Sequence, residues 1–415
     1  MEGILQGSEI PKEAKCPFSE SRAILDFPLQ RTCPFDPPPE YKRLRAEQPV
    51  AKVRLWNGGD AWLITRYDDF RKVLTDPRFS SDPTRPGYPG ANPGMSLARQ
   101  KYRTFISMDP PEHTVHRRML TGDFSVKRME LMRPKLQSIV DKLIDDMIEK
   151  GPPAELVEDF SFPLPSFVIC ELLGVPYSDH AFFQDRAKII ASNKTTAEEA
   201  AVATRELCEE YIGDLIKKKD ANPGDDLLSR LVGSYMRTGQ LTHTEMIGVA
   251  RQLLVAGHET TANTTALGIL LMLNHPDQIE ALRNDPRLVN GAVEEILRFL
   301  DVFQRHPTPE DVEVGGQLIR AGEGIIVANP SADRDENAFA DPDRFDIRRD
   351  ARHHVAFGYG VHQCLGQPLA RVELQVVFGT IFKRLPNLRL AAPFESLEFK
   401  NDMFVYGVEK LPVSW

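Results

Sequence analysis

Cysteine is scarce in this chain of 415 residues, and no two cysteines form a Cys-x-x-Cys pair. The five are widely spaced: Cys16, Cys33, Cys170, Cys208 and Cys364. Their odd number argues against a disulfide framework and is typical of a reduced, intracellular protein. The spacing also argues against an iron–sulfur cluster or a structural zinc site, because both need several ligands close together in the sequence.

Long apolar runs are absent as well. No stretch of ~18 apolar residues predicts a membrane span, and the amino terminus has no apolar core like that of a signal peptide. We therefore expect a cytoplasmic protein that does not bind a membrane. The formal net charge of −9 argues against a general nucleic-acid binder. A Gly-rich dinucleotide fingerprint is also missing, so the sequence predicts no dinucleotide-binding module of the Rossmann type.

The sequence does contain long helical patterns, with a few short strand patterns between them. Neither an internal repeat nor a domain boundary is visible, so we expect one mainly α domain over residues 1–415, with small β-sheets. The proline-rich residues 1–40 are expected to form an extended arm. A β-hairpin is predicted at 50–65, and the Pro/Gly-rich segment 80–107 is predicted to be a structureless binding loop or lid.

One helix has a clear start signal. Thr242 followed by Glu245 forms a capping box, and the pattern continues to Leu273. The helix is too apolar for the surface and is predicted to cross the core. Within it, Gly257 and Thr260 favour a break that leaves room for a small ligand, although a packing glycine is the alternative interpretation.

The chain is organised around residues 357–366, Phe-Gly-Tyr-Gly-Val-His-Gln-Cys-Leu-Gly. Three glycines allow a backbone path that other residues resist and the close approach of something flat. Pro368 is well placed for the first turn of a helix. The amides and dipole of that helix would favour the thiolate of Cys364, which makes this cysteine a candidate anionic ligand.

Axial ligation of haem suits a single thiolate better than the alternatives. Nucleophilic catalysis would need a base oriented on Cys364, and His362 is poorly spaced for that role. Haem supplies four ligands of its own and carries two propionates that need cationic partners. His113 and Arg117 lie four residues apart on one predicted helix face, where they form either such a clamp or an ordinary solvated basic face.

These motifs together resemble the cytochrome P450 family of haem-thiolate monooxygenases, in its soluble bacterial type. The match covers nearly the whole chain and includes F-G-x-G-x-H-x-C-x-G at 357–366, A-G-H-E-T-T at 256–261 and E-x-x-R at 295–298. Weaker likenesses at 172–176 and 406–413 point to actinobacterial branches. The resemblance implies a triangular helical prism with haem between the long central helix and the helix that follows the cysteine loop.

The resemblance also implies a role for each matching residue. Cys364 is the axial ligand of the iron in haem b, where its electron density favours cleavage of an O–O bond. Glu259 and Thr260 are the catalytic pair that delivers protons on the opposite face. Further residues contact the haem or hold its propionates: His113, Arg117, Ala256, Gly257, Arg305, His306, Phe357, Gly358, His362 and Gly366.

Two details concern the surroundings of the haem. Glu295 and Arg298 are implied to form a structural triad with Arg344. Where the family usually carries a further propionate-binding arginine, this chain has His306, with Arg305 beside it. Either His306 substitutes for that arginine, or the strand shifts so that Arg305 serves.

The implied function is hydroxylation or another oxidation of a medium-sized, largely apolar molecule, such as a secondary metabolite or xenobiotic. O2 and two electrons are needed, and NAD(P)H would supply the electrons through ferredoxin reductase and ferredoxin to a monomeric enzyme. Rival functions are nitric oxide reduction with electrons taken directly from a nicotinamide, peroxide-driven hydroxylation, and haem-based gas sensing. The pair Glu259 and Thr260 argues for oxygen activation, and no output domain for a sensor is visible.

Overall fold

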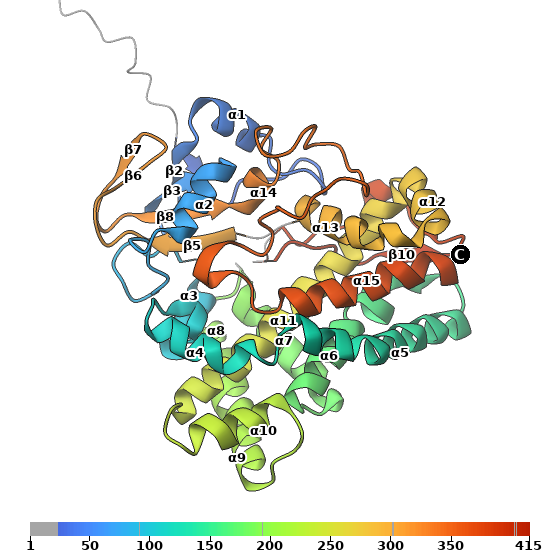
Figure 1. The fold of residues 1–415 in the computed structure, drawn as a ribbon, viewed down its shortest axis with the longest axis horizontal. Helices are drawn as coiled ribbons and strands as arrows, with labels where there is room; N and C mark the ends of the chain where they lie inside the picture. Colours follow the sequence, from blue (N-terminus) through green and yellow to red (C-terminus); the bar gives the residue numbers. More distant parts are fainter. Residues whose placement is uncertain (1–23, 91, 193, 301–302, 402, 404) are drawn as a thin grey trace, which may run out of the picture.

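The computed structural model describes residues 24–415 except 91, 193, 301–302, 402 and 404. Helices make up most of the molecule, and the largest sheet lies at one side of it, next to helices α1 (Glu40–Glu47) and α2 (Tyr67–Thr75) (Figure 1). The main core is a continuous set of buried side chains from the helical part, while two smaller clusters cover the two faces of the sheet.

The strands form three sheets. The largest has the order β1 (Leu25–Asp26), β2 (Val50–Arg54), β3 (Asp60–Ile64), β8 (Gly324–Ala328) and β5 (Phe303–Pro307). The others are β4 (Ala154–Glu155), β10 (Pro412–Ser414) and β9 (Arg389–Leu390), and the hairpin of β6 (Val312–Val314) and β7 (Gln317–Ile319). The predicted hairpin at 50–65 is confirmed, because β2 and β3 pair antiparallel. The described part of the amino-terminal arm lies against this sheet through β1, which pairs with β2.

The helices follow the sequence patterns closely. The first half of the chain contains α1 (Glu40–Glu47), α2 (Tyr67–Thr75), α3 (Pro93–Lys101), α4 (Glu112–Thr121), α5 (Val126–Lys150), α6 (Pro163–Leu173), α7 (His180–Ala191), α8 (Ala197–Arg205) and α9 (Gly213–Ala221). The second half contains α10 (Leu227–Leu231), α11 (His243–Leu273), α12 (Pro276–Asn284), α13 (Val289–Phe299), α14 (Asn329–Ala332) and α15 (Gln367–Arg384).

Helix α11 is the long helix that the capping box predicts. The Thr242 side chain accepts from the Glu245 amide, and the Glu245 carboxylate accepts from the Thr242 amide, so both ends of the box are present. Most of its residues are buried, and it runs through the middle of the molecule between α6 and α15 (Figure 1). The predicted break is absent. The helix continues past Gly257, although Thr260 Oγ1 donates to the Ala256 carbonyl at 2.7 Å as expected.

Segment 80–107 is not structureless as predicted, because it contains α3. The side chain of Asn92 accepts a hydrogen bond from the Met95 amide at 2.8 Å and caps this helix, with Pro93 in its first turn. Helix α3 packs against α7 and α8. The segment therefore contributes an ordered helix, and Met95 and Arg99 of this helix line a cavity together with residues of α11.

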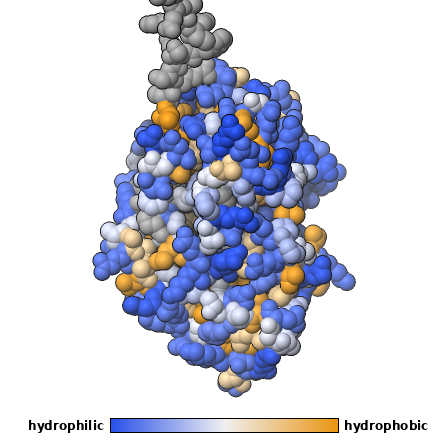
Figure 2. All heavy atoms as spheres, turned by 90° about the vertical axis from the view of Figure 1, so that its left-hand side faces the viewer, coloured by the Kyte–Doolittle hydropathy of each residue, from blue (hydrophilic) through white to orange (hydrophobic). Residues whose placement is uncertain are grey.

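Within the described residues, no helix is both long and apolar enough to cross a membrane. The face seen in Figure 2 is mostly hydrophilic, and its hydrophobic residues are scattered. Scattered apolar residues are normal on a protein surface and indicate no binding patch there.

Candidate active site

The loop that carries Cys364 is shaped by its glycines. Gly358 and Gly360 have φ values of 71° and 70°, a region that side chains resist. A Cβ on Gly360 would lie 2.2 Å from the Leu74 carbonyl oxygen, so this position also requires close approach of two backbones. The Cys364 amide donates to the Phe357 carbonyl at 2.8 Å and closes the loop just before α15.

The electrostatics of the thiol reflect two opposing effects. Burial raises the pKa of Cys364, while the backbone amides of Gly366 and Gln367 and the charges of Arg117 and Arg371 lower it. The amides at the start of α15 therefore favour the thiolate, as predicted from the sequence, but they act against the cost of burial. A bound metal cation would supply the missing stabilisation, because coordination deprotonates a thiol.

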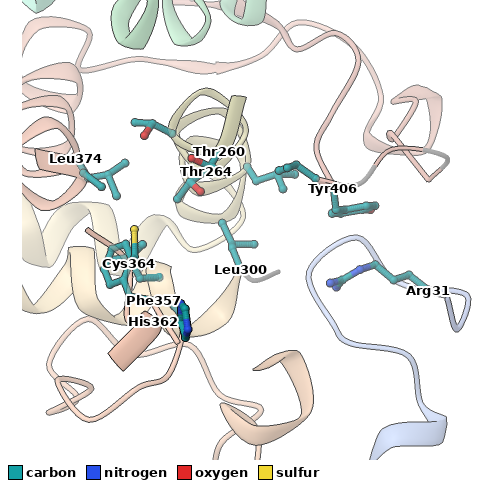
Figure 3. A pocket seen from close by; sticks show the side chains of 15 residues that line it. Arg31, Thr260, Thr264, Leu300, Phe357, His362, Cys364, Leu374 and Tyr406 are labelled. Atoms are coloured by element: carbon teal, nitrogen blue, oxygen red, sulfur yellow. The ribbon is translucent and has the colours of Figure 1, made fainter. Parts of the chain in front are cut away.

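A cavity separates Cys364 from α11. Its walls come from α11, α13, α15, the cysteine loop and the closing segment of the chain, and include Thr260, Leu300, Phe357, Leu374 and Tyr406. Figure 3 shows the sulfur of Cys364 pointing toward the turn of α11 that carries Thr260 and Thr264. The arrangement leaves space for a flat group between a thiol on one side and hydroxyl groups on the other.

Around His362, which lines this space, lie several buried nitrogen atoms without hydrogen-bond partners. These atoms are His113 Nδ1 and Nε2, Arg117 Nη1, His306 Nε2 and His362 Nδ1. The rings of His113 and His362 lie 4.2 Å apart between centroids. Burial lowers the pKa of His362 to about 3, with further lowering by His113, His306 and Arg117. These nitrogen atoms have no negatively charged partner, and one or two carboxylate groups could accept hydrogen bonds from them.

Of the two candidates on β5, His306 is the one whose placement is described. It is buried, and its Nδ1 lies 3.1 Å from the Ser80 carbonyl oxygen. Burial lowers the pKa of His306 to about 4, so the ring is neutral near pH 7. The side chain of Arg305 lies outside the described part of the structure.

The side chain of Glu259 is positioned between two cavities. Ala256 and Thr260 line one of them, and Thr260 also lines the cavity that contains Cys364; Lys188 and Lys400 line the other. Burial raises the pKa of Glu259, against the opposing charges of Lys400 and Lys188. The carboxyl is therefore suited to hold a proton and pass it on.

Gly257 does not face the cavity as predicted. An added Cβ would lie 3.1 Å from Ile169 Cδ1 of α6, so the glycine allows α6 and α11 to pack closely. The structure supports the alternative interpretation of a packing glycine.

The predicted triad is wrong in its third member. Glu295 and Arg298 form a fully buried bidentate pair, with distances of 2.8 and 2.9 Å. Arg349 Nε, not Arg344, reaches Glu295 Oε1 at 3.2 Å. The Arg344 side chain is 64% exposed and pairs with Asp346. Both arginines belong to one irregular loop, where no sequence period indicates which side chain turns inward.

A second buried network was missed by the sequence argument. Glu294 accepts from Arg371 Nε at 2.7 Å, and His354 Nε2 lies 3.0 Å from its other oxygen. Although burial opposes ionisation, these partners lower the pKa of Glu294 to about 2. The Arg371 guanidinium also lies 4.7 Å from the ring centroid of Phe357 and fixes the loop before Cys364. The sequence feature that could have predicted this network is the adjacent pair Glu294 and Glu295. If both acids are buried, each needs its own set of basic or hydrogen-bonding partners.

Comparison with known proteins agrees with this site. The family model "Cytochrome P450" matches residues 177–387. "Cytochrome P450 105A3" from Streptomyces carbophilus is 48% identical over 402 residues, which cover 96% of this chain and 98% of the relative. The chain belongs to the cytochrome P450 family. "Cytochrome P450-SU2" from Streptomyces griseolus is 50% identical over 396 residues, covering 94% and 97% of the two chains.

Solved P450 structures share the fold. The structure of cytochrome P450 MoxA from Nonomuraea recticatena is 46% identical, with a TM-score of 0.85, and covers 94% of this chain and 98% of its own. That of the mycinamicin VIII C21 methyl hydroxylase MycCI from Micromonospora griseorubida is 39% identical, with a TM-score of 0.89, and covers 94% and 100%. This chain is therefore a P450 monooxygenase with the P450 fold, and its family uses a haem-thiolate cofactor.

The residues of this P450 fit that cofactor. Among the described residues, Cys364 is the single thiol on the cavity wall, and the unpartnered nitrogens of His113, Arg117, His306 and His362 offer donors for carboxylate groups. Each buried nitrogen left without a partner is costly, and the propionates of haem would remove that cost.

Proposed function

We propose that this P450 uses O2 and two electrons to hydroxylate a medium-sized, largely apolar secondary metabolite or xenobiotic. The proposed cofactor is haem b, with Cys364 as its axial ligand. The proposed electron route runs from NAD(P)H through ferredoxin reductase and ferredoxin to a monomeric, cytoplasmic enzyme. Relatives support this substrate range, since they include a "Vitamin D3 dihydroxylase", 46% identical, and a "Pentalenic acid synthase", 44% identical.

The observation that carries the proposal is the acid and alcohol pair opposite Cys364. Thr260 lines the cavity that Cys364 also lines, and Glu259 is the next residue on the same helix. The Thr260 hydroxyl already donates to the Ala256 carbonyl, so its lone pairs are available to accept from a water or a bound oxygen species. In a nitric oxide reductase of this type we expect the acid and alcohol pair to be absent, and in a peroxide-driven hydroxylase we expect it to be altered.

Bound haem would supply the redox chemistry with oxygen, and the chain supplies orientation and protons. Cys364 would hold the iron, while His113, Arg117 and His362 would bind propionate oxygens. Burial raises the pKa of Glu259, which favours its protonated form, and its position between two cavities allows it to take up a proton on the Lys400 side. Thr260 orients the acceptor on the haem side.

Three electron sources distinguish this proposal from its rivals. The holoenzyme is given NADH alone, hydrogen peroxide, or NADH with ferredoxin and ferredoxin reductase, each with a substrate that perturbs the ferric spectrum. We expect product only with the ferredoxin system under O2. Product with peroxide at a similar rate, or nitric oxide consumption with NADH alone, would contradict the proposal.

A further inference from the structure

Arg251 of α11 is a buried cation without a partner. Its side chain is 8% exposed, its Nε has no hydrogen-bond partner, and no ion pair joins it to any residue in the described part of the chain. Burial lowers the pKa of its guanidinium, and nearby Arg99 adds to that effect. Guanidinium groups in protein interiors are normally paired, because an isolated buried charge is costly.

The neighbours of Arg251 do not provide a negative charge. Cys208 and Tyr102 are the acidic groups that act on it. Burial raises the pKa of Cys208 to about 11 and also raises the pKa of Tyr102, so both are neutral at physiological pH. Glu209 accepts from Tyr102 and Lys101 instead. The described part of the chain therefore provides no anionic partner for the guanidinium of Arg251, and a bound ligand could provide one.

Arg251 lines a mostly apolar cavity that leads toward the site of oxygen activation. Its walls include Met95 of α3, Ile190 of α7, and Val255 and Thr260 of α11. Thr260 and Val405 line both this cavity and the one that contains Cys364. Arg251 precedes Thr260 by nine residues, which places it about 13 Å away along the helix axis.

We propose that Arg251 binds the carboxylate of an amphipathic acid whose apolar body extends along α11 toward Thr260. A carboxylate can accept two parallel hydrogen bonds from a guanidinium, so it satisfies the charge and fixes the direction of the substrate. Arg99, whose Nη1 donates to Tyr88 Oη at 2.6 Å, places a second cation on the same wall. Glu259 also lines this cavity, and its carboxyl offers no positive charge to an anionic head group, so the two arginines fix the direction of the acid. This inference rests on the proposed function, because it assumes that oxidation occurs beside Thr260.

Matched ligands test the anion site directly. Dodecanoate and methyl dodecanoate share one apolar body and differ in charge. Their binding to the ferric holoenzyme is measured by calorimetry and, in parallel, by the change in the haem spectrum. We expect wild-type protein to bind the acid at least tenfold more tightly than the ester. Arg251→Met should abolish this preference, Arg251→Lys should keep part of it, and the control Arg344→Met should keep all of it.

Thermal unfolding provides a second readout. Without ligand, Arg251→Met should raise Tm, because it removes an unpaired buried charge, and dodecanoate should raise Tm of the wild type but not of this variant. Equal affinity for acid and ester in the wild type would overturn the proposal, as would unchanged acid binding or failed folding in Arg251→Met. The carbon monoxide spectrum of the same sample distinguishes failure of the proposed function from failure of the anion site. Absence of the thiolate band contradicts the proposed function. Equal binding of acid and ester with that band intact contradicts only the anion site at Arg251.

Discussion

Replacing Arg349 by Gln should destabilise the protein much more than the same replacement of Arg344. Arg349 has a side chain that is 14% exposed, and it donates to Glu295 as well as to the carbonyl oxygens of Ala340, Asp341 and Arg344. Arg344 has one ion pair, with Asp346, and a largely exposed side chain. The two residues are therefore a matched test of which arginine completes the buried cluster around Glu295.

The expected magnitudes follow from these contacts. A hydrogen bond to a charged group contributes about 1.5–3 kcal/mol, and Arg349 makes several. Because Arg298 still pairs with Glu295 and Gln retains one donor group, we expect a loss of about 2–4 kcal/mol rather than the full sum. An exposed pair such as that of Arg344 contributes about 0–1 kcal/mol.

Urea unfolding of both holoenzymes, followed by circular dichroism and haem absorbance, measures the difference. Arg349→Gln should unfold at clearly lower urea than the wild type, and Arg344→Gln should be within about 0.5 kcal/mol of it. Equal stabilities of the two variants, or a larger loss in Arg344→Gln, would refute the placement of Arg349 beside Glu295.

Three other predictions address the site and its support. Thr260→Ala should release more hydrogen peroxide per electron pair than the wild type or Thr264→Ala, which changes another hydroxyl on the cavity wall, and normal coupling would contradict the role of Thr260. Gly360→Ala should weaken haem retention and cost at least about 1–2 kcal/mol, because φ is positive and a Cβ would strike the Leu74 carbonyl; an unchanged urea midpoint would contradict this. Burial lowers the pKa of His258 to about 3, so the free energy of unfolding should fall as the pH drops below about 6.5, where only the unfolded imidazole takes up a proton. That contribution approaches about 1.4 kcal/mol per pH unit, and His258→Gln should lack it; equal slopes would contradict the burial of a neutral ring.

Local signals predicted most of the fold. The capping box at Thr242, the hairpin between β2 and β3, and Pro368 in the first turn of α15 each reflect interactions within a few residues, so the sequence alone determines them. Helix α3 was missed because prolines and glycines dominate its neighbourhood. The pair Asn92 and Pro93 was a usable signal, since it combines a capping side chain with a residue suited to the first turn.

The site could be predicted where a motif fixes the residue, and less well where only folding brings residues together. Cys364 and Thr260 do line one cavity. The prediction named Arg344 where the structure has Arg349. Both residues lie in an irregular loop, where the direction of a side chain depends on distant partners such as Glu295. The unpaired state of Arg251 was invisible in the sequence, because it depends on which groups from other helices surround it.

The central claim is that Cys364 is the thiolate ligand of a haem. The most direct measurement is the absorption spectrum of the reduced, carbon-monoxide-bound protein for the wild type and for Cys364→His. We expect the red-shifted Soret band of thiolate ligation in the wild type and its absence in the variant. A wild type without that band, or a variant that retains it, would contradict the claim.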